Sequence, residues 1–199
     1  MQIDGDLNLV FPITWNDAGP AVWAYHIPID RKVFEASYRL LAATKDVLCP
    51  KGDWSSSSPM IAALTLRDAG RSDAAQFGLP EGLTLEDGGT AAPLLAELKR
   101  LTSIMAPTAS GYESLPVGVA ISRKLLSEDD WMDAESALVF FTCAFSLIQR
   151  GLRVTLGPAF AAALRGSITS SSPTDFAKSL KISTPAEASE AAEPSSVPS

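Results

Sequence analysis

Few residues of this chain combine the types and spacing that catalysis requires, and its single histidine is the first to consider. A histidine acts as a general base when a neighbouring group orients its ring for proton transfer. His26 lies between Tyr25 and Ile27 in a run of β-forming residues, with no serine or cysteine motif beside it. We therefore favour a structural role for His26 over a catalytic one.

Three polar segments could in principle hold an ion or a nucleophile. Gly88-Gly89-Thr90 precedes an expected helix and could hold an anion, although a loop with a threonine cap also explains it. The acidic residues at positions 129, 130, 133 and 135 could bind a metal, but carboxylates there also stabilise a helix dipole. Ser55 to Ser58 has no sequence neighbour that could deprotonate a serine.

The common catalytic and cofactor motifs are missing from the sequence. It contains no GxSxG, HExxH, Walker loop, CxxC or Rossmann glycine pattern. We therefore expect no catalytic residue, no metal and no cofactor, and a protein that is not an enzyme. A small enzyme built around His26 remains a minor alternative.

The charge and hydrophobicity of the chain limit the classes of partner that it can bind. The chain has 199 residues and a net charge of −7, and its 16 Lys and Arg residues are scattered, which argues against nucleic acid. The most hydrophobic run, from Ala137 to Ile148, is about 12 residues long, well short of the roughly 20 residues that span a bilayer. Two distant cysteines and an acidic start without a signal-peptide pattern lead us to expect a cytosolic, thiol-reduced protein.

The front of the chain predicts a β-hairpin that runs directly into a long helix. Leu7 to Trp15 and Ala21 to Ile29 are rich in β-formers, and Asn16 to Gly19 suits a turn. Pro28 and Asp30 then stop the strand and cap an amphipathic helix over Arg31–Leu48. Because a hairpin alone is marginal in water, we expect it to pack on that helix.

Further elements follow from apolar periodicity and from Gly, Pro and capping residues. We expect a helix from Pro59 to about Gly70, an irregular connector over Arg71–Gly89, a helix from Thr90 with Leu94, Leu95, Leu98, Leu101 and Met105 on one side, a strand or extended link over Leu115–Ile121, a helix from Glu128 to Arg150, and short helices over Pro158–Arg165 and Pro173–Lys181.

The helix that starts at Glu128 is apolar nearly all round, so we expect it at the centre of the core. The last residues, 183–199, hold almost no large apolar side chain and should be disordered. The sequence thus predicts a mainly helical α+β domain over residues 1–182, with an N-terminal β-hairpin packed on a helical body and a disordered C-terminal tail over 183–199.

Three helices offer more apolar surface than a small core needs, so part of it could bind a partner helix or a second copy of the chain. The alternative, that all of it is core, stays open. The candidate partner-binding residues are Phe34, Tyr38, Leu41, Trp131, Leu138, Phe141 and Phe145.

This layout resembles the tail assembly chaperones of long-tailed bacteriophages. The hairpin over Leu7–Ile29, the helix opening Pro28 to Ala36 and the polar segment Ser183–Ser199 carry the resemblance. It implies a protein that binds the tape measure protein, or another tail protein, in the host cytoplasm. The alternative is a structural virion component, such as a neck, tail or capsid-associated protein, whose hairpin joins a neighbour's sheet. Neither reading predicts nucleic-acid or membrane binding, and homo-oligomers remain possible.

Overall fold

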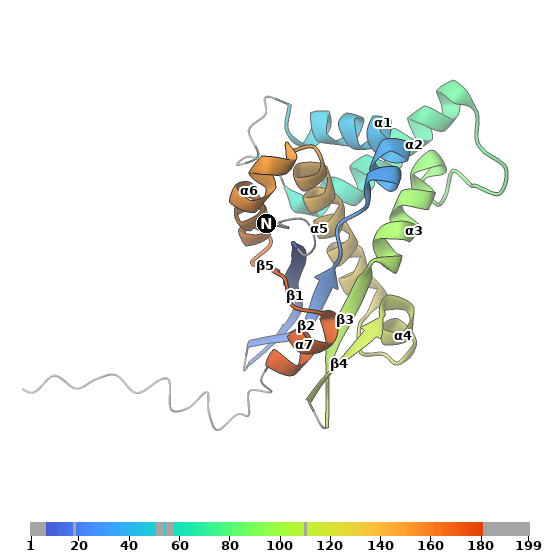
Figure 1. Ribbon diagram of the computed structural model, residues 1–199. Coiled ribbons are helices and arrows are strands. Elements are labelled where there is room, and N and C mark those ends of the chain that lie inside the picture. The colour runs from blue at the N-terminus through green and yellow to red at the C-terminus, as the bar shows by residue number, and fades with distance from the viewer. Residues whose placement is uncertain (1–6, 18, 51–53, 55–57, 110, 181–199) are drawn as a thin grey trace, which may run out of the picture.

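The computed structural model describes residues 7–17, 19–50, 54, 58–109 and 111–180 and confirms a mainly helical α+β fold (Figure 1). One antiparallel sheet has the strand order β4-β3-β2-β1-β5. The strands are β1 Asn8–Asn16, β2 Gly19–His26, β3 Thr102–Thr108, β4 Gly111–Pro116 and β5 Ser167–Thr169. The α-helices are α1 Arg31–Leu48, α2 Ala62–Phe77, α3 Ala92–Arg100, α4 Val117–Ser122, α5 Glu128–Ser146, α6 Arg153–Ala163 and α7 Pro173–Ser179, and the short 3-10 helices are η2 Pro59–Ile61, η3 Gly89–Ala91 and η4 Arg150–Leu152.

The expected hairpin is confirmed, but it packs on a different helix from the one predicted. β1 pairs with β2, with register shifts between Pro12 and Trp15, and Asp30 caps α1 by accepting from the Val33 amide at 2.8 Å. The inner face of the hairpin, with Leu9 and Phe11, packs on α5. α1 instead contributes to a second cluster with α2, α3 and α5.

α5 lies at the centre of the molecule, as predicted. Of its 19 residues, 13 are buried. Leu138 and Phe141 face the sheet cluster, whereas Val139 and Phe140 face the cluster that contains α1, α2 and α3. The Ser127 side chain accepts from the Asp130 amide at 3.0 Å and so caps the helix as its sequence indicates. The helix ends at Ser146 rather than at Arg150.

Several predicted boundaries were wrong, each for a local reason. α2 passes through Gly70 and reaches Phe77, so the irregular connector begins at Gly78, seven residues later than predicted. Met105 lies in strand β3, whereas the sequence analysis had placed it on the helix that starts at Thr90. Pro116 ends β4, and Val117 begins a helix rather than continuing an extended segment. α6 starts at Arg153 and carries Pro158 inside it.

The short strand β5 was not predicted, since three residues carry too little periodicity to be recognised. It pairs with Asn8–Val10 at one end of the sheet, and it leads into α7. The Ser172 side chain caps α7 by accepting from the Asp175 amide at 3.1 Å, which confirms the predicted start. The predicted disordered tail, 183–199, lies outside the described residues.

Two shortened chains test the C-terminal boundary. Ending the chain at Ile182 should leave the melting temperature nearly unchanged, because residues 183–199 offer little apolar area. Ending it at Ser172 removes Phe176 and Leu180 from the sheet and should lower the free energy of unfolding by about 2–5 kcal/mol. Chemical denaturation of the two chains makes the comparison; equal stabilities would show that α7 contributes nothing.

Candidate partner-binding groove

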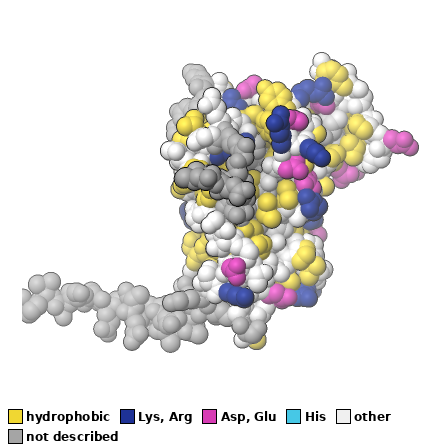
Figure 2. Space-filling model, viewed as in Figure 1, with side chains coloured by type: hydrophobic (Ala, Val, Ile, Leu, Met, Phe, Trp, Pro, Cys, Tyr) yellow, Lys and Arg dark blue, Asp and Glu magenta, His cyan; other side chains and the backbone are white. Residues whose placement is uncertain are grey.

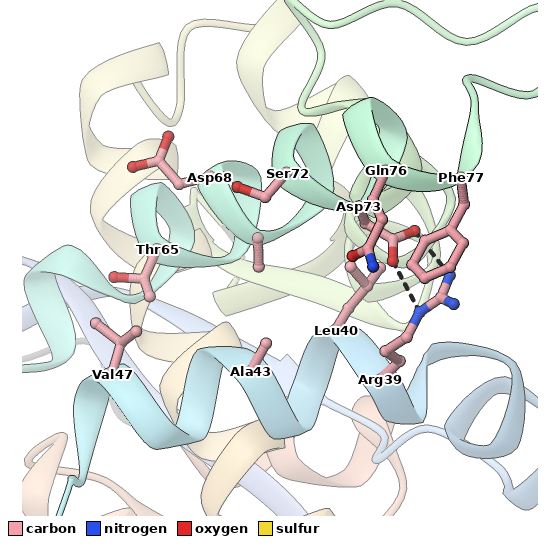
Figure 3. Close-up of a pocket in the computed structure, with 11 residues that line it drawn as sticks. Arg39, Leu40, Ala43, Val47, Thr65, Asp68, Ser72, Asp73, Gln76 and Phe77 are labelled. Carbon is pink, nitrogen blue, oxygen red and sulfur yellow. Dashed lines mark hydrogen bonds and ion pairs between the residues drawn. The ribbon is translucent and has the colours of Figure 1, made fainter.

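A groove of about 490 Å³ runs along the surface between α1 and α2 (Figure 3). One wall comes from α1 and the other from α2. The lining residues are Arg39, Leu40, Ala43 and Val47 of α1 and Thr65, Asp68, Ala69, Ser72, Asp73, Gln76 and Phe77 of α2.

The spacing of these residues explains why a hollow forms. Leu40, Ala43 and Val47 of α1 are three and four positions apart, so they form one row along the helix, and Arg39 lies beside its first member. The small side chains of Ala43 and Ser72 lie near the middle of the groove, while Val47 and Phe77 lie at opposite ends (Figure 3). Val47 is 64% exposed and Phe77 is 59% exposed, so the groove carries a large apolar side chain at each end.

An ion pair joins the two helices at the Phe77 end. Arg39 Nε donates to Asp73 Oδ1 at 2.7 Å, and its Nη2 donates to Asp73 Oδ2 at 2.9 Å. The guanidinium also lies 4.1 Å from the centroid of the Phe77 ring. Asp73 is buried and lies 2.9 Å from the Thr90 hydroxyl, whereas the Arg39 side chain is 62% exposed. The Arg39 side chain at this end of the groove is therefore held in place by Asp73 and Phe77, but it remains accessible to solvent.

Behind the groove, α2 packs backbone to backbone on the segment that precedes α3. A Cβ at Gly70 would clash with the Gly88 carbonyl oxygen and lie 2.6 Å from the Ala91 nitrogen. Gly89 adopts a φ of +61°, and its amide donates to the Thr84 carbonyl at 2.9 Å. These close contacts require glycine, because a side chain would not fit between the two backbones. The glycines therefore serve packing, in line with the loop interpretation of Gly88-Gly89-Thr90.

The seven predicted partner-binding residues fall into two groups. Phe34 and Tyr38 lie on α1, where their ring centroids are 5.8 Å apart; Tyr38 is 55% exposed and Phe34 is half-buried. Neither lines the groove. The other five, Leu41, Trp131, Leu138, Phe141 and Phe145, are buried in the two core clusters and offer no surface to a partner in the folded chain.

Sequence reasoning missed the groove because its α2 wall extends beyond the predicted helix end at Gly70. Leu40 and Val47 were visible as apolar residues that widen the face of α1. The other signal in the sequence was the spacing of the small and polar residues Ser72, Asp73 and Gln76. These residues extend the helical pattern only if Gly70 is accepted inside the helix.

His26 is fully buried at the end of β2. The Thr102 hydroxyl donates to the Leu98 carbonyl at 2.7 Å, so its oxygen accepts from His26 Nδ1 at 3.0 Å. His26 Nε2 has no hydrogen-bond partner among the described residues, and burial lowers the pKa of the ring from 6.5 to about 3. The histidine is therefore neutral at pH 7 and inaccessible to a substrate, in line with the structural interpretation.

Two of the four acidic candidates, Asp130 and Glu135, also have structural partners, and residues 55–57 of the serine segment lie outside the described residues. The Asp130 amide and carboxylate both contact Ser127, and Glu135 forms a largely buried ion pair with Arg67 of α2. Burial raises the pKa of the Cys143 thiol to about 12. Within the described ranges, no group of three or more His, Cys, Asp or Glu residues is placed to hold a metal ion.

On the face drawn in Figure 2, Lys and Arg side chains are interspersed with Asp and Glu. No helix in the described part of the chain is both long enough and apolar enough to cross a membrane. Comparisons with protein-family models, with curated proteins and with solved structures found no match.

The burial of His26 predicts a loss of stability in acid. Below pH 6.5 the unfolded chain binds a proton at His26, while the folded chain does not until about pH 3. Between pH 7 and pH 4 this group should therefore lower the free energy of unfolding by about 3 kcal/mol. Urea unfolding of the wild type and His26→Leu at both pH values isolates this contribution. An identical pH dependence in the two proteins would contradict it.

Proposed function

We propose that the chain is an assembly chaperone of long-tailed phage tails, and that the groove between α1 and α2 holds an amphipathic helix of the tape measure protein. The observation that carries this proposal is the solvent-facing hollow between two helices, with Val47 at one end and Phe77 at the other. The layout resemblance supplies the identity of the partner.

The shape of the groove suits a helix. From Arg39 to Val47, α1 rises about 12 Å, which corresponds to about two turns. The small residues Ala43, Ala69 and Ser72 let a third backbone approach closely, as in helical bundles. An apolar stripe on the incoming helix would cover Leu40 and Val47.

The Phe77 end of the groove has the composition of an energetic hot spot. Arginine and aromatic residues dominate such sites because they combine large contact area with directional hydrogen bonding. Arg39 is held by Asp73 and Phe77, yet much of its side chain remains exposed. It can therefore contact a partner with little further loss of side-chain freedom.

Coexpression with an aggregation-prone tape measure fragment tests the proposal. The wild type should keep the fragment in the soluble fraction. Ala43→Trp fills the hollow from an exposed position and should reduce the soluble fragment about tenfold, equivalent to about 1.4 kcal/mol of binding.

The matched control is Ala75→Trp, which changes an exposed residue of α2 that does not line the groove. It should protect the fragment as well as the wild type does. A fragment that stays insoluble with the wild type would count against the chaperone role. Equal protection by all three proteins would place the binding surface elsewhere.

The sheet edge favours a second candidate, a structural virion component that pairs with a neighbour's strand. The predicted hairpin is unsuited to this, because β2 lies inside the sheet between β1 and β3. β4 instead ends the sheet, with no further strand beside it among the described residues. Mass spectrometry of purified particles separates the roles, since a chaperone is absent from mature virions and a structural subunit is abundant.

A further inference from the structure

α6 is an apolar helix that lies at the periphery of the molecule (Figure 1). The sequence from Val154 to Leu164 contains no charged residue. Only Gly157 and Ala161 are buried, and a Cβ at Gly157 would lie 3.2 Å from the Phe145 ring of α5. A helix that is apolar nearly all round is normally covered on every side. The described part of the chain therefore leaves the outer side of α6 without the cover that its composition calls for.

The exposed side of α6 forms a continuous stripe. Leu152, Thr155, Ala159 and Ala162 recur at intervals of four or three positions, on the side opposite the two buried residues. Leu152 is 47% exposed, and Leu156 flanks the stripe at 38% exposure. We call these five residues the α6 stripe. A single exposed apolar side chain needs no explanation, but a contiguous apolar surface marks a site of interaction.

A hollow of about 240 Å³ lies beside the C-terminal end of α6. Leu164 and Arg165 contribute to its wall on this side, and the exposed side chain of Met60 also lines it. The charged residues of the lining are Arg165 and Asp133, and neither forms an ion pair with a described residue. Their opposite charges cancel, so the α6 stripe and the hollow together carry no net charge.

We propose that a second copy of this chain covers this surface, with the two α6 helices antiparallel and related by a two-fold axis near Ala159. In such a contact, each residue before Ala159 faces a residue the same distance after it. Leu156 then lies against Ala162 of the other copy, and Leu152 reaches the hollow beside Arg165. The large side chains in the first half of the α6 stripe are thereby matched to small side chains and a hollow in the second half.

This match of the α6 stripe to its own reverse is what points to a second copy as the occupant. Charge supports the same arrangement. Each copy carries a net charge of −7, so two copies repel each other over most of their surfaces. At the α6 stripe they can meet without burying like charges. Because Ala159 and Ala162 are small, the two helix axes can approach to about 8 Å.

The size of the contact predicts a weak dimer. One short helix and one hollow from each copy bury less than the roughly 1,200 Å² of total surface that stable interfaces bury. The dimer should therefore form reversibly and dissociate on dilution. The α6 stripe and the hollow share no residue with the groove between α1 and α2. A failure of the dimer would therefore leave the proposed chaperone role untouched.

Sedimentation of the full chain over a range of concentrations tests the dimer. The wild type should show a monomer–dimer equilibrium. Ala159→Glu places two like charges at the axis and should weaken dimerisation at least about tenfold. The matched control is Ala75→Glu, which adds the same charge at an exposed position of α2 and should leave the equilibrium unchanged.

Cross-linking tests the position of the axis. Ala159→Cys should form a disulfide-linked dimer under mild oxidation, because the two copies of this residue lie within disulfide reach at the axis. The native Cys49 and Cys143 are buried, and Ala75→Cys is the matched control that should not cross-link.

Three outcomes would overturn the proposal. The first is a wild type that stays monomeric up to about 1 mM. The second is a dimer that Ala159→Glu does not weaken, or equal cross-linking of the two cysteine variants. The third is a monomeric wild type that floats with phosphatidylcholine vesicles, which would assign the α6 stripe to a lipid surface.

Discussion

The burial of α5 on both sides is the constraint on which the rest of the structure depends. Its sheet-facing side, with Leu138 and Phe141, needs a broad apolar surface, and the hairpin extended by β3 supplies one. Its other side, with Val139 and Phe140, needs helices, and α1, α2 and α3 supply them. A helix with this composition is stable in water only when both surfaces are covered, so the two halves of the molecule form around it.

The elements that sequence reasoning recovered are those whose information is local. Asp30 and Ser127 cap α1 and α5 through hydrogen bonds three residues away, and the start of each helix was predicted correctly. The alternation of β-formers around a turn predicted the hairpin. The fold class followed because these long, strongly patterned segments make up most of the chain.

The errors come from residues whose conformation depends on distant contacts. Gly70 reads as a helix end, but in the structure it lets α2 approach the backbone of Gly88 and Ala91. Met105 fits a helical stripe, yet its pairing with Trp23 places it in a strand. The candidate site was affected in the same way: large apolar residues such as Phe141 were assigned to a surface that α5 does not have. Their burial follows from the sheet, whose third strand the sequence did not reveal.

The contacts at Gly70 and Asp73 also determine how a partner would meet the groove. The glycine packing prevents α2 from sliding along the loop behind it, and the Arg39–Asp73 pair holds α2 to α1. The groove is therefore preorganised, and a partner loses little affinity to rearrangement of this chain. Recognition then requires ordering on the partner's side alone. Association should proceed without a slow conformational step in this protein, as in rigid-body docking.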